Sequence, residues 1–131
     1  MMTEGEFFAA MDAAVLRWTA NRTGEVFGVR HFDQAKENDC HANAEKYASL
    51  NGGIVVRGFL IQPLDGWAFV WVISHSVVRT NQGLEDVTLA ASQLRGGLTF
   101  FSIEPMTEGY LEWARKYPRE RRPVPQISLD S

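Results

Sequence analysis

Apolar residues recur at helical spacing in the first twenty positions of the chain. The stripe consists of Phe7, Phe8, Met11, Val15 and Trp18. It predicts an amphipathic helix over residues 6–20, which the segment 21–24 would stop. A second helix is expected from Cys40 to about Ser49, because Asp39 is a favourable N-cap residue and the Asn-Gly-Gly sequence that follows is a strong stop signal.

The middle of the chain has the composition of β-strands. β-branched and apolar residues dominate segments 54–62, 67–79 and 84–90, and the sequences PLDG and TNQG separate these runs. Both separators contain residues that turns favour, so the three runs predict antiparallel strands. Residues 96–103 can add a fourth strand. The central run is apolar on both faces, so each face should be at least partly covered.

A third helix is expected towards the C-terminus, where Thr107 would cap the sequence EGYLEWARKY and Pro118 would close it. The proline-rich residues 119–131 predict an extended tail. We therefore expect an α+β fold, in which helices pack on a three- to four-stranded antiparallel sheet. Residues 1–118 would form this single domain, as a length of 131 residues allows.

Composition and charge narrow the function classes. The chain is 45% hydrophobic and 22% charged, as globular proteins are. Its net charge of −3 favours neither nucleic acid nor an anionic membrane. No apolar run reaches the roughly 18 residues of a membrane-spanning helix, and the acidic start of the chain is unlike a signal peptide. A single cysteine cannot form an intramolecular disulfide, so we expect a cytoplasmic protein.

The single cysteine is the strongest candidate for chemistry. Cys40 is expected at a helix N-terminus, where unpaired N–H groups and the helix dipole favour a thiolate. His75 lies on the central predicted strand and Asp86 on the next one. A helix packed on the sheet could bring Cys40 to His75, and Asp86 could then hold the imidazole in the required tautomer. A buried, inert cysteine is the competing interpretation.

The register of the second hairpin decides whether the last two residues can meet. A two- or four-residue loop within TNQG pairs Val77 with Asp86, which places Asp86 on the same face as His75. A three-residue loop pairs Val78 with Asp86 and places it on the opposite face. The sequence leaves both registers open.

A cysteine that opens a helix, a histidine on a strand in SHSVV and an aspartate on the next strand in LEDVT resemble the papain-like superfamily, most of all its transglutaminase-like branch. The resemblance covers about residues 34–90. It implies acyl transfer through a cysteine thioester, with Cys40 as nucleophile, His75 as general base and acid, and Asp86 as the orienting residue. Gln34, six residues before the cysteine as in papain-type enzymes, would share the oxyanion hole with the Cys40 N–H.

Three further residues lie near this candidate site. Asn43 falls near the helix face of Cys40 and can line the pocket or bond locally. Trp71 shares the predicted face of the candidate histidine and can wall an acyl pocket or pack in the core. If PLDG forms the loop, Gly58 lies opposite Trp71 and leaves room for the indole. His41 stands where papain has a tryptophan, and we expect it to cap the helix or face solvent.

Two other site types are weaker. A mixed zinc site would need Cys40, His31, His75 and Asp86. The chain has no C-x-x-C, H-x-x-x-H or H-E-x-x-H spacing, so we expect neither a metal nor a cofactor. The basic sequence RKYPRERR, residues 115–122, is short and interrupted by an acidic residue, so we expect a solvated tail here.

The sequence thus predicts a small cysteine-dependent hydrolase or acyltransferase that acts on an amide, isopeptide or related acyl bond. We expect a peptide, a protein or another amide-bearing substrate, and neither nucleic acid nor a membrane as a partner; the oligomeric state is open. The alternative is a non-catalytic binding or accessory protein, for example a phage-related one, on a papain-like scaffold. An open pocket around Cys40, His75 and Asp86 would favour the enzyme.

Overall fold

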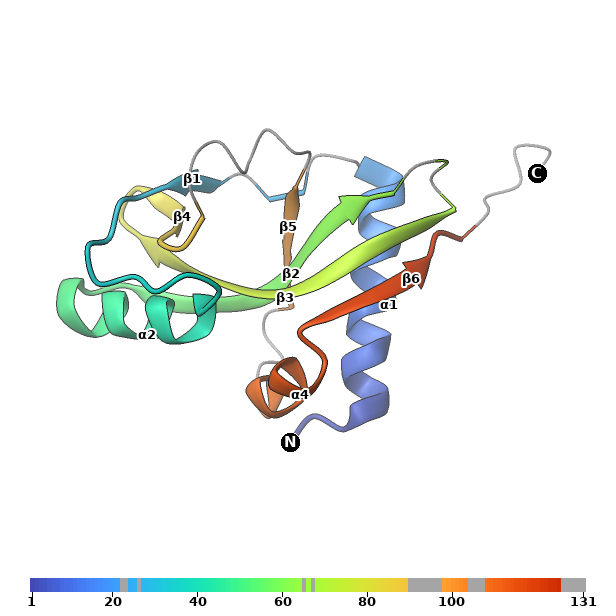
Figure 1. Cartoon of the computed structure of the whole chain (residues 1–131), viewed down its shortest axis with the longest axis horizontal. Helices are drawn as coiled ribbons and strands as arrows, with labels where there is room; N and C mark the ends of the chain where they lie inside the picture. The colour runs from blue at the N-terminus through green and yellow to red at the C-terminus, as the bar shows by residue number, and fades with distance from the viewer. Residues whose placement is uncertain are drawn as a thin grey trace.

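The structure is a computed structural model that describes residues 1–21, 24–25, 27–64, 66, 68–89, 98–103 and 108–125. Within these residues, three helices accompany a six-stranded sheet, which confirms the predicted α+β class (Figure 1). The helices are α1 (Glu4–Asn21), α2 (Cys40–Asn51) and α4 (Tyr110–Lys116). The strands are β1 (Phe27–Val29), β2 (Ile54–Pro63), β3 (Phe69–Thr80), β4 (Gly83–Asp86), β5 (Thr99–Ser102) and β6 (Arg119–Pro123).

The helices form close to where the sequence predicts them. The first begins slightly earlier than expected, because the Thr3 hydroxyl accepts the Glu6 N–H while the Glu6 carboxylate accepts the Thr3 N–H. This reciprocal capping satisfies two of the free donors of the first turn. The second begins at Cys40, as predicted. The expected cap of the third, Thr107, lies outside the described residues.

The sheet differs from the expected one in strand number and direction. Its order is β1-β4-β3-β2-β5, and β6 pairs with β3. Strand β1 runs parallel to β4, whereas the other pairs are antiparallel, so the sheet is mixed rather than antiparallel. Strand β1 spans only three residues, too few for an alternating pattern to stand out in the sequence.

The predicted C-terminal tail contributes a strand to the domain. Residues 119–123 pair with 69–73 of β3, so this part of the tail belongs to the sheet. Strand β4 pairs with only 78–80 of β3 on that side, which leaves the rest of the edge free for β6. Unpaired backbone groups of an edge strand are a template for another strand, and the arginine-rich segment satisfies them despite its polarity.

The hairpin of β2 and β3 has a longer loop than PLDG. Pro63 pairs with Val70, and Gly58 lies opposite His75 rather than opposite Trp71, which corrects the expected register. The shift is an even number of residues on each strand, so every side chain keeps its predicted face. Gly58 is needed for another reason: a Cβ there would lie 2.2 Å from a backbone oxygen of β5.

The hairpin of β3 and β4 adopts the register that brings the candidate residues together. Val78 pairs with Glu85 and Thr80 with Gly83, which leaves a two-residue loop. The same register places Asp86 opposite Val77 and on the face of His75. The sequence had left this choice open.

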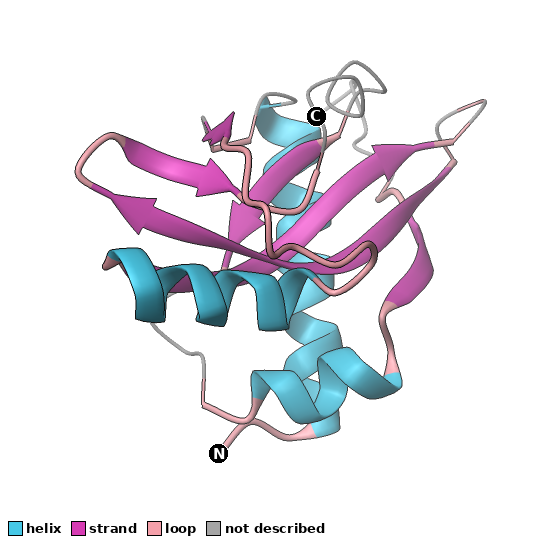
Figure 2. Ribbon diagram, turned by 60° about the vertical axis from the view of Figure 1, so that its left-hand side comes forward, coloured by secondary structure: helices cyan, strands magenta, loops and turns pink. Residues whose placement is uncertain are grey.

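Helices cover one face of the sheet at two places. Helices α1 and α4 pack over the larger core cluster, which includes Phe59, Ile61, Val70, Val72 and Phe101. Helix α2 lies along the other end of the β2–β3 hairpin, as Figures 1 and 2 show. The opposite face holds a smaller cluster of Val56, Leu60, Val77 and Phe100. The N-terminus of α2 is thereby directed at the middle of β3.

Candidate active site

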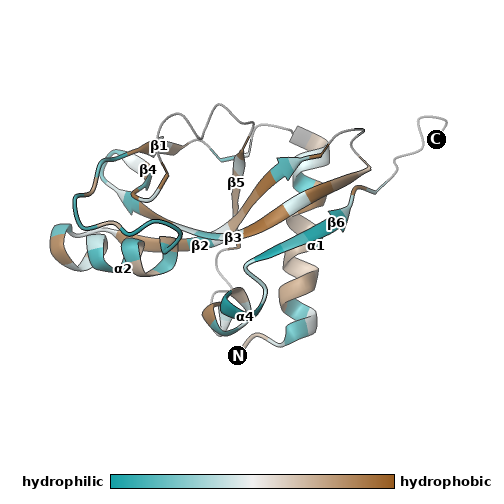
Figure 3. Cartoon of the chain, viewed as in Figure 1, coloured by the Kyte–Doolittle hydropathy of each residue, from teal (hydrophilic) through white to brown (hydrophobic). Residues whose placement is uncertain are grey.

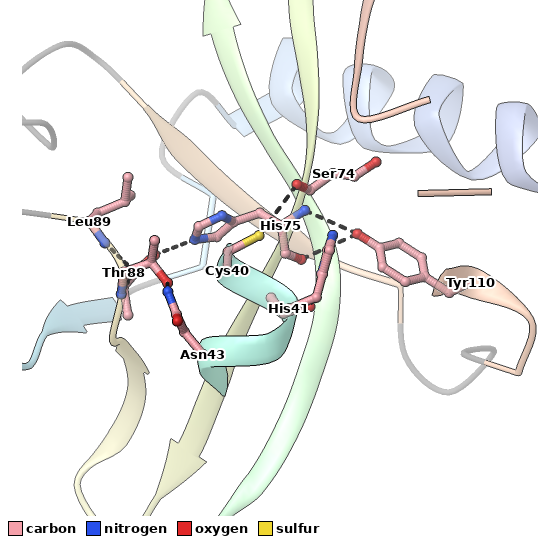
Figure 4. Close-up of polar contacts among 10 residues, drawn as sticks. Cys40, His41, Asn43, Ser74, His75, Thr88, Leu89 and Tyr110 are labelled. Atoms are coloured by element: carbon pink, nitrogen blue, oxygen red, sulfur yellow. Dashed lines mark hydrogen bonds and ion pairs between the residues drawn. The ribbon is translucent and has the colours of Figure 1, made fainter. Parts of the chain in front are cut away.

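Cys40 meets β3 where that strand has a free edge. Residues 69–73 of β3 pair with β6 and residues 78–80 with β4, so residues 74–77 lie between the two neighbours. The first turn of α2 occupies this place, and the Cys40 Sγ lies 3.8 Å from the Ser74 carbonyl oxygen (Figure 4). Helix α2 therefore presents its cysteine beside the histidine of the strand.

His75 and Asp86 form a buried hydrogen-bonded pair. The His75 Nε2 contacts Asp86 Oδ2, and their side chains are 4% and 0% exposed. The second carboxylate oxygen, Oδ1, accepts the N–H groups of Thr88 and Leu89 at 2.8 and 2.7 Å. Because Nε2 is engaged by Asp86, the other ring nitrogen, Nδ1, is the one available to Cys40. This is the orientation that nucleophile activation by an imidazole requires.

The electrostatics of the three groups reinforce one another. Burial raises the pKa of Cys40, but hydrogen bonds to His41 and His75 and the charge of His75 outweigh it and lower the pKa from 9.0 to about 6. Burial lowers the pKa of His75, but the bonds to Asp86 and Cys40 raise it to about 9. Burial also raises the pKa of Asp86, yet the His75 bond brings it below its usual value. A thiolate beside an imidazolium is thus favoured between about pH 6 and 9.

A second imidazole, which the sequence analysis did not assign to the site, also reaches Cys40. The Nδ1 of His41 lies 2.6 Å from the Ser76 hydroxyl, which accepts from Arg57 at 3.0 Å. The hydroxyl proton is then free to donate to His41 Nδ1, which leaves the Nε2 proton for the thiolate. Glu45 holds Arg57 at 2.5 Å. The sequence signal for this role of His41 is its position next to Cys40. The contact with Ser76 forms only when α2 packs on the sheet, so the sequence does not show it.

Tyr110 fixes the backbone under the histidine. Its buried hydroxyl accepts the His75 N–H at 3.0 Å and donates to the Gly58 carbonyl at 2.6 Å. The phenol therefore bridges the two strands at the Gly58–His75 pair. Burial raises the pKa of Tyr110, so the hydroxyl stays neutral and keeps both bonds. No local sequence signal marks this tyrosine, which arrives from α4.

The structure separates Gln34 from the candidate site. Gln34 is exposed and lines a different hollow, next to Tyr47 and Leu50. A position six residues before the cysteine does not place the amide at the thiol, because the intervening turns lead it away. The predicted oxyanion role of Gln34 is therefore wrong. The first-turn N–H groups of α2 remain available instead, since Asp39 makes no side-chain capping bond.

Asn43 and Trp71 do not line the cleft either. Asn43 is buried; its Oδ1 accepts the Lys36 N–H at 2.9 Å, and its Nδ2 donates to the Lys36 carbonyl and to the Thr88 hydroxyl. It therefore ties the segment before α2 to the segment after β4 and bonds locally. Trp71 packs under Arg119, whose Cζ lies 3.9 Å from the ring centroid.

An open cleft of about 670 Å³ surrounds the cysteine. Its polar and charged lining residues are Asn38, Asp39, His41, Gln62, Ser74, Thr88, Arg115 and Arg119. Its apolar lining residues are Ala42, Leu60, Ile73, Leu89, Leu98, Ala114 and Pro118. Cys40 and His75 both face this space. A substrate can therefore reach the thiol from solvent.

The remaining site and partner predictions concern metals and membranes. His31 is exposed, bonds to Asp33 at 2.6 Å and lies apart from the cleft, so the four zinc candidates do not meet. In the described part of the chain, no three histidine, cysteine, aspartate or glutamate side chains gather as a metal site. Among the helices of those same residues, none has both the length and the apolar character needed to cross a membrane.

The chain matches no protein-family model, no curated protein and no solved structure. The α+β architecture is compatible with many families. The likeness to the papain-like superfamily therefore stays a prediction.

Proposed function

We propose that this protein is a cysteine-dependent hydrolase or acyltransferase that acts on an amide, isopeptide or related acyl bond. The observation that carries the proposal is the arrangement of Cys40, His75 and Asp86 at an open cleft. A cysteine with a pKa of about 6 is mostly thiolate at neutral pH, whereas an inert buried cysteine is a neutral thiol.

The residues have distinct roles in the proposed reaction. The Cys40 thiolate attacks the carbonyl carbon, and its electron pair forms the carbon–sulfur bond while the carbonyl electrons move to oxygen. The first-turn N–H groups of α2 stabilise that oxyanion; one such donor lowers the barrier by about 3 kcal/mol. When the oxyanion collapses, the bond to the leaving amine or alcohol breaks and the His75 imidazolium protonates it.

The second half of the reaction resolves the thioester. Neutral His75 takes a proton from water or from an incoming amine, which then attacks the carbonyl carbon and releases Cys40 as thiolate. Asp86 stays ionised and keeps Nε2 engaged, so that Nδ1 carries each proton. His41 donates to the thiolate and stabilises it before attack.

A non-catalytic binding protein has less support. A protein that only binds through this surface has no need for two imidazoles on one thiol or for a buried carboxylate behind one of them. Buried charged groups are costly, and active sites are where they recur. The open cleft beside the thiol also supports the enzyme over the binding protein.

The test uses p-nitrophenyl acetate, an activated ester that reports acylation without knowledge of the substrate. The native protein should release a burst of p-nitrophenolate equal to the protein concentration and gain one acetyl group on Cys40, detected by intact mass. Cys40→Ala should abolish the burst, and His75→Gln should lower its rate by about 10²-fold or more. His31→Gln is the matched control and should behave as the native protein.

Two results would contradict the proposal. The first is a native protein that acetylates no faster than the Cys40→Ala variant. The second is an equal loss of rate in the His31→Gln and His75→Gln variants, because exposed His31 has no place in the mechanism. Either result would leave the binding protein as the better interpretation.

A further inference from the structure

A row of arginines and aromatic rings continues from the cleft along the sheet. We name Phe69, Trp71, Arg119 and Arg121 the arginine–aromatic row. On β6, Arg119 pairs with Ile73 and Arg121 with Trp71, two β3 residues on the same face as His75. The Arg119 Cζ lies 3.9 Å from the Trp71 ring centroid, and the Arg121 Cζ lies 4.4 Å from that of Phe69.

The row is open to solvent. Phe69 is 38% exposed, and Arg119 and Arg121 are exposed as well. In Figure 3 the hydrophilic strand β6 runs beside the hydrophobic end of β3. Stacking on the rings holds each guanidinium in place, so little side-chain freedom remains to be lost when a ligand binds.

The positive charges of the row have no carboxylate partner within the residues that the structure describes. Arg122, on the other face of β6, binds Asp12 at 2.9 Å, whereas no described carboxylate forms an ion pair with Arg119 or Arg121. Arg115 of α4 adds a third guanidinium that has no ion-pair partner among the described residues, and Arg115 and Arg119 both line the cleft. The carboxylate among the lining residues, that of Asp39, belongs to the α2 side.

We propose that the row binds an acidic segment of a peptide substrate, with a carboxylate side chain one or two residues from the attacked carbonyl. This inference rests on the function proposed above. Arg119 lies beside Ile73, which is two residues from His75 on the same face, or about 7 Å along the strand. One or two residues of an extended peptide span that distance. The planar guanidinium suits a carboxylate, to which it can make two parallel hydrogen bonds.

The acidic peptide is favoured over a nucleic acid for two reasons. The thiol that the row adjoins reacts with carbonyl groups, which a peptide supplies at every residue. The row also carries only two arginines, and the net charge of the chain is −3, whereas nucleic-acid sites combine many phosphate contacts with a basic surface.

The test compares short peptide chloromethyl ketones that differ only in having glutamate or glutamine at the first or second residue from the reactive carbon. In the alkylation, the Cys40 thiolate displaces chloride and forms a carbon–sulfur bond. The rate is followed by intact mass and divided by the rate with iodoacetamide. At one of the two positions the glutamate probe should react about tenfold faster than its glutamine twin, which corresponds to about 1.4 kcal/mol.

Variants assign the preference to the row. Arg119→Gln should bring the glutamate-to-glutamine ratio close to one, while Arg119→Lys, which keeps the charge, should restore a preference for glutamate. Arg122→Gln changes the same strand on its opposite face and is the matched control; it should leave the ratio unchanged. A ratio that Arg119→Gln does not alter would overturn the inference.

Other outcomes separate this inference from the proposed function. Equal rates with glutamate and glutamine probes, in a protein whose iodoacetamide reaction has its inflection near pH 6, would overturn the acidic-peptide inference alone. An inflection near pH 9 would overturn the proposed function and the inference with it. Fluorescence anisotropy with a labelled single-stranded oligonucleotide covers the other ligand class: binding that Arg119→Gln abolishes would assign the row to nucleic acid and overturn the peptide.

Discussion

The pH dependence of Cys40 alkylation is the most direct consequence of the site geometry. The two imidazoles lower the pKa of the thiol from 9.0 to about 6. At pH 6, about half of Cys40 is then thiolate, against about 0.1% of an ordinary thiol with a pKa of 9, a ratio of about 500. A thiolate of lower pKa is also a weaker nucleophile, by about 20-fold over this range. Before the effect of burial, the advantage of Cys40 at pH 6 is therefore about 25-fold.

The sign of this difference reverses with pH. Above about pH 8 the ordinary thiol ionises as well, and its more basic thiolate should overtake Cys40. The assay is the second-order rate of reaction with iodoacetamide from pH 4 to 10, followed by intact mass and compared with a cysteine peptide. Burial of the sulfur lowers the rate by the same factor at every pH, so the inflection tests the reasoning and the absolute rate does not.

Histidine variants show which group lowers the pKa. A hydrogen bond to a charged group contributes about 1.5–3 kcal/mol, so loss of His41 or of His75 should move the inflection up by about one to two pH units. His41→Gln and His75→Gln test this in turn, and His31→Gln should leave the inflection near 6. A native profile with one inflection near pH 9 would refute the idea that either imidazole stabilises the thiolate.

The pH profile of acylation and the stability of the β2–β3 pair give further tests of the site. The acylation rate should be bell-shaped in pH, falling below about 6 as the Cys40 thiolate is protonated and above about 9 as the His75 imidazolium loses the proton that the leaving group needs. Tyr110→Phe removes the hydroxyl that bridges the His75 N–H and the Gly58 carbonyl. The free energy of unfolding, measured with urea, should fall by about 1–3 kcal/mol. Gly58→Ala forces a Cβ to 2.2 Å from a backbone oxygen and should lower the free energy of unfolding by about 3 kcal/mol. A Cβ at Gly28 would meet no atom within 4 Å, so Gly28→Ala should change that free energy little.

Residues with strong local signals were predicted well. Helix α2 follows Asp39 and ends at Asn51, before Gly52, and the capping residue and the glycine stop signal are both visible in the sequence. The hairpin strands also formed where β-branched residues cluster. The face of His75 was correct although its predicted partner was wrong, because side chains alternate with period two and the register error was even.

Residues whose role depends on distant partners were predicted poorly. Gln34 was placed by analogy of spacing, but its position depends on the loop before α2, which turns it away from the thiol. His41 acquires its role from Ser76 and Arg57, on two strands that the sequence cannot align with the helix. Tyr110 reaches the Gly58–His75 pair from α4.

The sequence by itself determined the α+β class, the helix that begins at the cysteine and the strand that carries the histidine, because propensity, capping and alternation act over a few neighbouring residues. Tertiary structure alone decided that Asp86 shares the face of His75, that β6 completes the sheet and that a second imidazole reaches the thiol. Those outcomes depend on loop closure and on packing between segments far apart in the chain, where small differences in free energy select one register or contact among several that the local pattern allows equally.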